Sequence, residues 1–235
     1  LKEDLRSLKM NKKILIVAAH PDDEVLGCFG TVARLIQEGY EAYTLILGEG
    51  KTSRDEKRVV ENKKDELDIL NSEIKNANDI IGIKKTFIYN FPDNRFDSVD
   101  LLDIVKVISK VKEEIRPDII FTHYENDLNI DHKITYQAVI TATRPMQNES
   151  VKEIYSFEIL SSTEWNYPLS FSPDTFFDIE DTLDLKISAM KEYKSELCIY
   201  PHPRSIEGIE LNAKYNGMRV GKKYVEAFKS VRVIK

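Results

Sequence analysis

The sequence contains few of the residues on which several classes of protein depend. Two cysteines, Cys28 and Cys198, are too few among 235 residues for a disulfide framework or a thiolate zinc site. The longest unbroken apolar run, from Ile14 to Ala19, is far shorter than the roughly 20 residues of a membrane helix. The first residues, LKEDLRSLKMNKK, contain no apolar segment of a secretory signal. These absences predict a cytoplasmic protein without a transmembrane segment.

Acidic residues outnumber basic residues. The chain has 34 Lys and Arg residues against 40 Asp and Glu residues, a formal net charge of −6, so we expect no binding to nucleic acid. An apolar fraction of 42% and a charged fraction of 31% are typical of a globular protein. Because neither a repeat nor a low-complexity linker divides the chain, residues 1–235 are predicted to form a single domain.

Apolar runs and helical patterns alternate along the first two thirds of the chain. Strands are predicted over residues 14–17, 42–47, 86–91 and 119–122, and helices over 24–38, 54–81, 99–115 and 130–143. The last third is less regular, with predicted strands over 154–160, 175–179 and 228–234 and a helix over 183–194. The alternation predicts an α/β fold, in which a doubly wound, mostly parallel sheet has helices on both faces.

Ligands of such a sheet bind beyond the carboxyl ends of its strands. The polar segment that follows the first strand reads Ala19-His20-Pro21-Asp22-Asp23-Glu24. An Asp at the start of a helix can simply be an N-cap, but that role accounts for only one of these acids. Three adjacent carboxylates repel one another and favour a cation.

A second polar segment, Asn129-Ile130-Asp131-His132, opens the helix after the fourth strand. A lone histidine at such a place is often structural. Together with His20 and Asp23, however, His132 completes a set of two imidazoles and one carboxylate. This set suits Zn²⁺ or Fe²⁺ and leaves coordination positions open for water and substrate.

These two segments resemble the PIG-L/LmbE-like family of zinc-dependent sugar de-N-acetylases, and the resemblance extends to Glu226-Ala227-Phe228. It implies a Rossmann-like three-layer sandwich and a hydrolase that removes an acetyl group from an N-acetylated sugar, such as N-acetylglucosamine, or from a glycoconjugate. His20, Asp23 and His132 would bind the metal, which is Zn²⁺ or alternatively Fe²⁺ or another divalent ion. Asp22 would be the general base. Since some relatives assemble, a homo-oligomer is a further expectation.

The chain departs from the family at Asn129, where many members carry a histidine that assists the oxyanion or acts as an acid. An asparagine donates a hydrogen bond but cannot deliver a proton. The missing acid is therefore expected at His202, which lies between two prolines, or at His123.

Four residues are expected to bind substrate, and two other functions stay open. The substrate-binding candidates are His123, Asp127, Arg204 and Arg95. The long segment over residues 148–173 is expected to determine substrate selectivity. One alternative function is an amidase that acts on a non-sugar amide with the same site. The other is a family member that binds a metal or a glycan without catalysis. The asparagine at position 129 would then be the sign of the lost activity.

Overall fold

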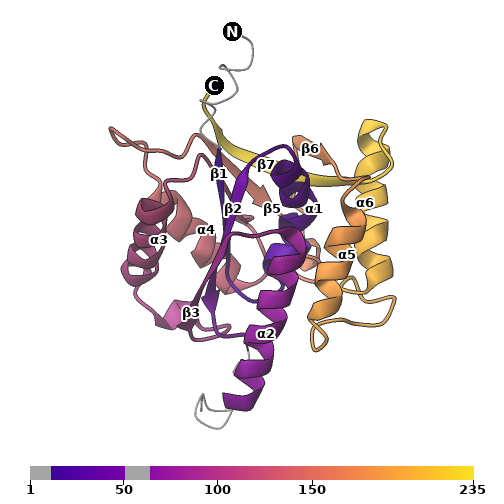
Figure 1. The fold of residues 1–235 in the computed structure, drawn as a ribbon, viewed down its shortest axis with the longest axis horizontal. Coiled ribbons are helices and arrows are strands. Elements are labelled where there is room, and N and C mark those ends of the chain that lie inside the picture. The colour runs from indigo at the N-terminus through magenta and orange to yellow at the C-terminus, as the bar shows by residue number, and fades with distance from the viewer. Residues whose placement is uncertain (1–11, 51–63) are drawn as a thin grey trace.

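A seven-stranded sheet runs through the middle of the molecule (Figure 1). The structure is a computed structural model, and it describes residues 12–50 and 64–235. The strands lie in the order β3-β2-β1-β4-β5-β7-β6. Their bounds are Lys13–Ala18 (β1), Glu41–Gly48 (β2), Lys85–Phe91 (β3), Ile119–His123 (β4), Glu153–Phe157 (β5), Thr175–Asp178 (β6) and Val225–Val233 (β7). Strands β1 to β5 pair in parallel, and β7 is antiparallel to both β5 and β6.

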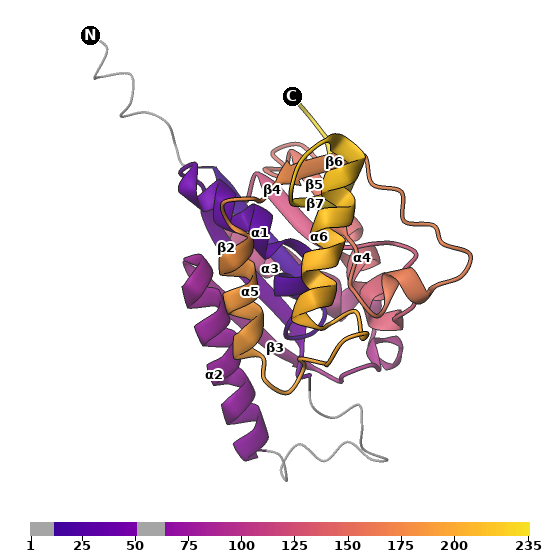
Figure 2. The ribbon, with the colours of Figure 1, turned by 90° about the vertical axis from the view of Figure 1, so that its right-hand side faces the viewer.

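Helices cover both faces of this sheet. Their bounds are Asp23–Gln37 (α1), Lys64–Ile81 (α2), Leu101–Ile115 (α3), Ile130–Ala142 (α4), Leu183–Glu192 (α5) and Ile206–Val220 (α6). Helices α3 and α4 lie on one side, and α1, α2, α5 and α6 lie on the other (Figures 1 and 2). The predicted mostly parallel α/β fold is confirmed. Residues 54–63 of the helix predicted over 54–81 lie outside the described residues.

Strand β1 shows why the sheet forms a middle layer. Ile14, Ile16 and Ala18 pack into the core under α1 and α2, whereas Leu15 and Val17 pack into the core under α3 and α4. All five side chains are fully buried. A strand that is covered on both faces needs apolar residues at every position, and this explains the unbroken run that begins at Ile14.

The strand order positions the candidate site. From β1 the chain proceeds to β2 and β3 on one side, and then returns to β4 and β5 on the other side of β1. The carboxyl ends of β1 and β4 are therefore neighbours at the point where the strand order reverses, which is where doubly wound sheets bind ligands. His20 follows β1 and His123 ends β4, so both lie at this point.

Helix α6 was missed in the sequence, where it appeared irregular. Two internal glycines, Gly208 and Gly217, weaken its helical signal. Both are required by packing, because a Cβ atom would lie 2.3 Å from the carbonyl oxygen of Pro203 at Gly208 and 2.5 Å from that of Lys222 at Gly217. The helix begins at an N-cap, Ser205, whose hydroxyl accepts a hydrogen bond from the Gly208 amide at 2.9 Å.

The sequence predicts no transmembrane segment. Among the residues that the structure describes, no helix is long and apolar enough to cross a bilayer.

Candidate functional site

The turn after β1 lies close against the end of β2. The Gly48 amide donates a hydrogen bond to the Ala19 carbonyl at 2.7 Å. A Cβ atom on Gly48 would lie 2.8 Å from that carbonyl oxygen and 3.3 Å from Cδ2 of His20. Only glycine permits this approach, which holds His20 at the carboxyl end of the central strands.

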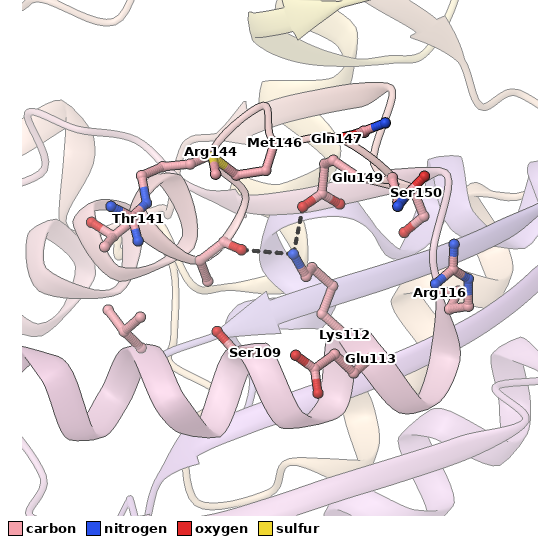
Figure 3. A pocket seen from close by; sticks show the side chains of 13 residues that line it. Ser109, Lys112, Glu113, Arg116, Thr141, Arg144, Met146, Gln147, Glu149 and Ser150 are labelled. Atoms are coloured by element: carbon pink, nitrogen blue, oxygen red, sulfur yellow. Dashed lines mark hydrogen bonds and ion pairs between the residues drawn. The ribbon is translucent and has the colours of Figure 1, made fainter.

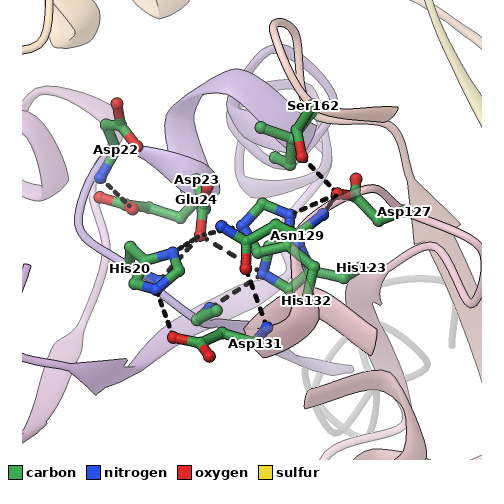
Figure 4. A network of polar contacts seen from close by, with 12 residues as sticks. His20, Asp22, Asp23, Glu24, His123, Asp127, Asn129, Asp131, His132 and Ser162 are labelled. Carbon is green, nitrogen blue, oxygen red and sulfur yellow. Dashed lines mark hydrogen bonds and ion pairs between the residues drawn. The ribbon is translucent and has the colours of Figure 1, made fainter. Parts of the chain in front are cut away.

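His20, Asp23 and His132 converge, as the sequence predicted (Figure 4). One ligating atom from each residue lies within 4.8 Å of the others. Oδ2 of Asp23 is 3.5 Å from Nδ1 of His20 and 3.5 Å from Nε2 of His132. Two imidazole nitrogens and one carboxylate oxygen are a donor set for Zn²⁺ or Fe²⁺, and these residues fit such an ion.

A carboxylate stands behind each of the two imidazoles. Nε2 of His20 is 2.9 Å from Oδ2 of Asp131 and 3.3 Å from Oδ1 of Asp93. Nδ1 of His132 is 3.1 Å from Oδ1 of Asp127. Such partners fix the ring orientation and tautomer of a metal-binding histidine, so that its other nitrogen faces the metal. This second observation supports the same three residues as candidate ligands.

The excess of carboxylates also affects the protonation of the site. Burial lowers the pKa of His20, but the carboxylates of Asp131 and Asp23 outweigh burial and raise that pKa to about 10. Burial raises the pKa of Asp23, but His132 and His123 outweigh burial and hold that pKa well below its usual range. The site therefore stabilises positive charge between these groups, as a cation site requires.

Asp127 lies behind His132 and has no exposed surface. Its carboxylate accepts hydrogen bonds from the hydroxyls of Ser162 and Thr163 and from the backbone N–H of Asn129. Burial opposes ionisation, but the nearby His132 and the hydrogen bonds from both hydroxyls lower the pKa of Asp127 to about 2. Asp127 is thus placed to orient His132, whereas the sequence predicted that it contacts substrate.

His123 lies beneath the site and is fully buried. Its ring stacks on His132 with 4.0 Å between the ring centroids, and its Nε2 accepts a hydrogen bond from the Ala19 amide at 2.9 Å. Burial and the neighbouring His132 hold the pKa of His123 well below its usual range. A fully buried imidazole has no surface with which to meet a substrate.

Asp22 occupies the N-cap position of α1 without acting as a cap. Its φ of 90° lies in the left-handed region, and within the described residues its side chain makes no capping hydrogen bond. Oδ2 of Asp22 instead lies 3.0 Å from Nη1 of Arg204. Burial raises the pKa of Asp22 to about 7 against the opposing effect of Arg204. A strained backbone and a carboxylate directed away from the helix are typical of a functional residue.

The remaining predicted residues lie on loops around this centre. Asn129 is the N-cap of α4, and its Nδ2 donates a hydrogen bond to Oδ1 of Asn94 at 2.7 Å. Arg95 is exposed on the loop after β3. His202 is half-buried, accepts a hydrogen bond at Nδ1 from the Arg204 amide and meets Trp165 edge-on, with 5.7 Å between the ring centroids.

Glu24 holds the turn at Asp22 in place, a role that the sequence did not predict. It is fully buried, and its carboxylate accepts hydrogen bonds from the Asp22 amide, the Tyr193 hydroxyl and the Asn78 side chain. Burial raises its pKa to about 8. Glu24 thereby connects the turn at Asp22 to α2 and to the residue that follows α5. Nothing local marks Tyr193 or Asn78 as its partners.

A separate pocket of about 290 Å³ lies at the C-terminal ends of α3 and α4 (Figure 3). These helix ends precede β4 and β5, so the pocket lies at the amino ends of these strands, whereas the candidate site lies at the carboxyl ends. Lys112 in its wall donates hydrogen bonds to the Ala142 carbonyl and to Glu149. Its described lining contains none of the predicted site residues.

The chain is similar to known proteins over most of its length. The PIG-L family model, described as GlcNAc-PI de-N-acetylase, matches residues 15–143. YaiS of Escherichia coli strain K12, an uncharacterized deacetylase, is 30% identical over 197 residues, which cover 81% of this chain and 95% of YaiS. A diacetylchitobiose deacetylase of Thermococcus kodakarensis is 26% identical over 234 residues, which cover 94% of this chain and 83% of the relative.

A solved structure shares the fold. The N,N'-diacetylchitobiose deacetylase of Pyrococcus horikoshii, in complex with its inhibitor MPG, matches with a TM-score of 0.72 at 21% sequence identity. The match covers 99% of this chain and 93% of that chain. The similarity therefore includes the last third of the sequence, which the family model does not match.

Proposed function

Because this chain belongs to the PIG-L family, we propose that it is a metal-dependent deacetylase that removes an acetyl group from an N-acetylated sugar or glycoconjugate. The names of its relatives support deacetylation, and the diacetylchitobiose deacetylases support a sugar substrate. The observation that carries the proposal is the convergence of His20, Asp23 and His132, with a carboxylate behind each imidazole.

The metal proposed for this site is Zn²⁺, with Fe²⁺ or another divalent ion as the alternative. Two imidazoles and one carboxylate leave positions open for water and substrate. When bound, such an ion supplies Lewis-acid polarisation of the amide carbonyl and acidification of the attacking water.

Asp22 is proposed as the general base. Its carboxylate is buried beside Asp23 and is held by Arg204 at 3.0 Å. It accepts a proton from the water whose oxygen forms the new bond to the acetyl carbon. When the C–N bond breaks, Asp22 returns this proton to the leaving nitrogen. One water is consumed, and the products are acetic acid, which ionises to acetate by giving its proton to solvent or to the amine, and a free amino group on the sugar.

Two further residues are proposed to assist this reaction. Asn129 and His202 are the candidates for donating a hydrogen bond to the oxyanion that develops on the amide oxygen. Arg95, which is exposed after β3, is the remaining candidate for a contact with substrate. A single domain, a homo-oligomer and a cytoplasmic location stay predictions.

The metal assignment is tested by elemental analysis of protein purified without chelator. We expect about one Zn²⁺ per wild-type chain, and strong loss of metal in Asp23→Ala and His132→Ala. Asp103→Ala is a matched control, because Asp103 is exposed and pairs with Lys106 on the surface of α3. Stoichiometric metal that persists in His132→Ala would show that this ligand is wrong.

The reaction is tested by acetate release from N-acetylated mono- and disaccharides. Asp22→Asn is expected to abolish turnover while retaining metal, because an amide cannot accept the proton. Wild-type activity in this variant would refute the general base. Hydrolysis of simple amides but not of sugars would favour the amidase, and glycan binding without acetate release would favour the non-catalytic member.

A further inference from the structure

We infer that Arg204 is a positioning residue that holds the carboxylate of Asp22 in place for proton transfer. This inference rests on the proposed function of Asp22. Nη1 of Arg204 lies 3.0 Å from Oδ2 of Asp22, and the two side chains are 24% and 2% exposed. The sequence predicted that Arg204 binds substrate, whereas its guanidinium contacts the proposed base.

The guanidinium is itself held in a defined direction. Its Nε donates a hydrogen bond to Oγ of Ser161 at 2.8 Å, and Nη1 lies 3.8 Å from Oε2 of Glu196. Because guanidinium is planar and its donors form a rigid fork, the bond from Nε to Ser161 fixes the direction of Nη1 towards Asp22. A lysine ammonium, which is a point charge on a flexible stem, has no such second anchor.

Three separate segments meet at this contact. Asp22 lies in the turn between β1 and α1, Ser161 follows β5, and Arg204 ends the loop between α5 and α6. The same loop contains His202, which accepts a hydrogen bond from the Arg204 amide at 3.1 Å. Arg204 and Ser161 both lie beyond residue 143, where the family model ends. The last third of the chain thus contributes to the geometry of the proposed base.

Asp22 requires such a partner because its own turn does not secure the side chain. Its φ of 90° is unfavourable for a residue other than glycine, and its carboxylate caps none of the described amides of α1. Without Arg204 the carboxylate is free to adopt other rotamers. A displacement of about 1 Å at a reacting group costs about 100-fold in rate.

A positioning role and a substrate-binding role predict different kinetics. If Arg204 positions Asp22, its loss lowers kcat and leaves KM within about threefold of wild type. If Arg204 binds substrate in the ground state, its loss raises KM while kcat changes little. The division between kcat and KM therefore separates the two roles.

The experiment compares Arg204→Ala, Arg204→Lys and Ser161→Ala with wild type in the acetate-release assay at equal metal content. Arg204→Ala is expected to lower kcat about 100-fold. Arg204→Lys should recover only part of this loss, and Ser161→Ala should lower kcat less, because Arg204 keeps its charge. Guanidinium chloride at millimolar concentration should partly restore Arg204→Ala. Arg219→Ala is the matched control and should retain wild-type kcat, because Arg219 is exposed on α6 and its guanidinium lies over the Phe176 ring.

A crystal structure of each folded variant supplies a reading that does not depend on turnover. We expect the Asp22 carboxylate to occupy a different rotamer in Arg204→Ala and its original position in Arg219→Ala. An unmoved Asp22, or a loss confined to KM, would overturn the inference. Loss of turnover in Arg219→Ala would also overturn it, because the fall in kcat would not be specific to the contact with Asp22. A wild-type chain that releases no acetate would instead count against the proposed function. If Arg204→Ala does not fold, Arg204→Lys and Ser161→Ala answer the same question.

Discussion

The buried ion pair of Lys186 and Glu226 gives a sharp prediction about stability. Lys186 lies on α5 and Glu226 on β7, and both are about 6% exposed. Nζ of Lys186 donates to Oε1 of Glu226 at 2.5 Å and to the Leu26 carbonyl at 2.8 Å. Glu226 accepts hydrogen bonds from the amides of Gly30 at 3.1 Å and Thr31 at 2.6 Å. The pair therefore binds backbone groups in the middle of α1.

This contact connects the last third of the chain to the helix that begins at the candidate site. In an α-helix the Leu26 carbonyl and the Gly30 amide are partners of each other. Here the Leu26 carbonyl accepts a hydrogen bond from Lys186, and the Gly30 amide donates one to Glu226, so both groups have a partner from outside the helix. Gly30 permits the approach, since a Cβ atom there would lie 3.0 Å from Oε1 of Glu226.

Lys186→Met is expected to destabilise the protein by about 3–5 kcal/mol, because it leaves the Glu226 carboxylate buried without its cation. For a chain of this length about 2–4 °C is lost per kcal/mol, so the Tm should fall by about 6–20 °C. Glu226→Gln should cost a similar amount, because it leaves the Lys186 ammonium buried without its anion. The double variant Lys186→Met/Glu226→Gln should cost less than the sum of the single changes, because neither charge remains unpaired.

The assay is urea and thermal unfolding of each variant at pH 7. Lys191→Met is the matched control, because Lys191 is exposed on the same helix, and it should change stability by less than about 0.5 kcal/mol. A loss below about 1 kcal/mol in Lys186→Met, or strictly additive single changes, would refute the view that this pair is one buried electrostatic unit.

Three further predictions concern single residues. Asp127→Asn should weaken metal affinity about 10–100-fold by loosening the orientation of His132, as a metal titration will show; unchanged affinity would refute this role. Asn129→Asp should retain stability, because Asp also caps helices, but should lower kcat about 100-fold if the amide of Asn129 stabilises the oxyanion. Wild-type turnover there would exclude that role. Hydrogen bonds from Lys229 and Ser230 outweigh burial and lower the pKa of Asp174 from 3.8 to about 2, so Asp174 stabilises the fold above pH 3.8 and loses this effect as the pH falls to about 2. Asp174→Asn should therefore cost about 1 kcal/mol or less at pH 6, since the group is exposed, and this cost should shrink as the pH falls from 3.8 towards 2; a cost that stays constant over this range in a pH series of unfolding would contradict this.

The sequence by itself determined the elements whose pattern is local. The apolar run from Ile14 must be buried on both faces, so it predicted a central strand, and the periodicity after Glu24 predicted α1 with nearly its observed bounds. The metal-binding residue types and the spacing from His20 to Asp23 are equally local, and the identified family followed from them. Helix α6 was missed because local propensity opposes its two glycines, which are required by neighbours distant in sequence.

Only the tertiary structure decided which residues act together. His20 and His132 meet because β1 and β4 are neighbours in the sheet, and strand order is a property of the whole chain. The environment of each carboxylate is likewise non-local: Asp127 lies behind His132, and Asp22 turns away from its helix towards Arg204. Periodicity reports the burial of one face of an element, whereas the partner of a polar side chain depends on which elements pack together. For that reason the sequence identified the candidate ligands, and the fold determined which carboxylates orient them and which arginine holds the proposed base.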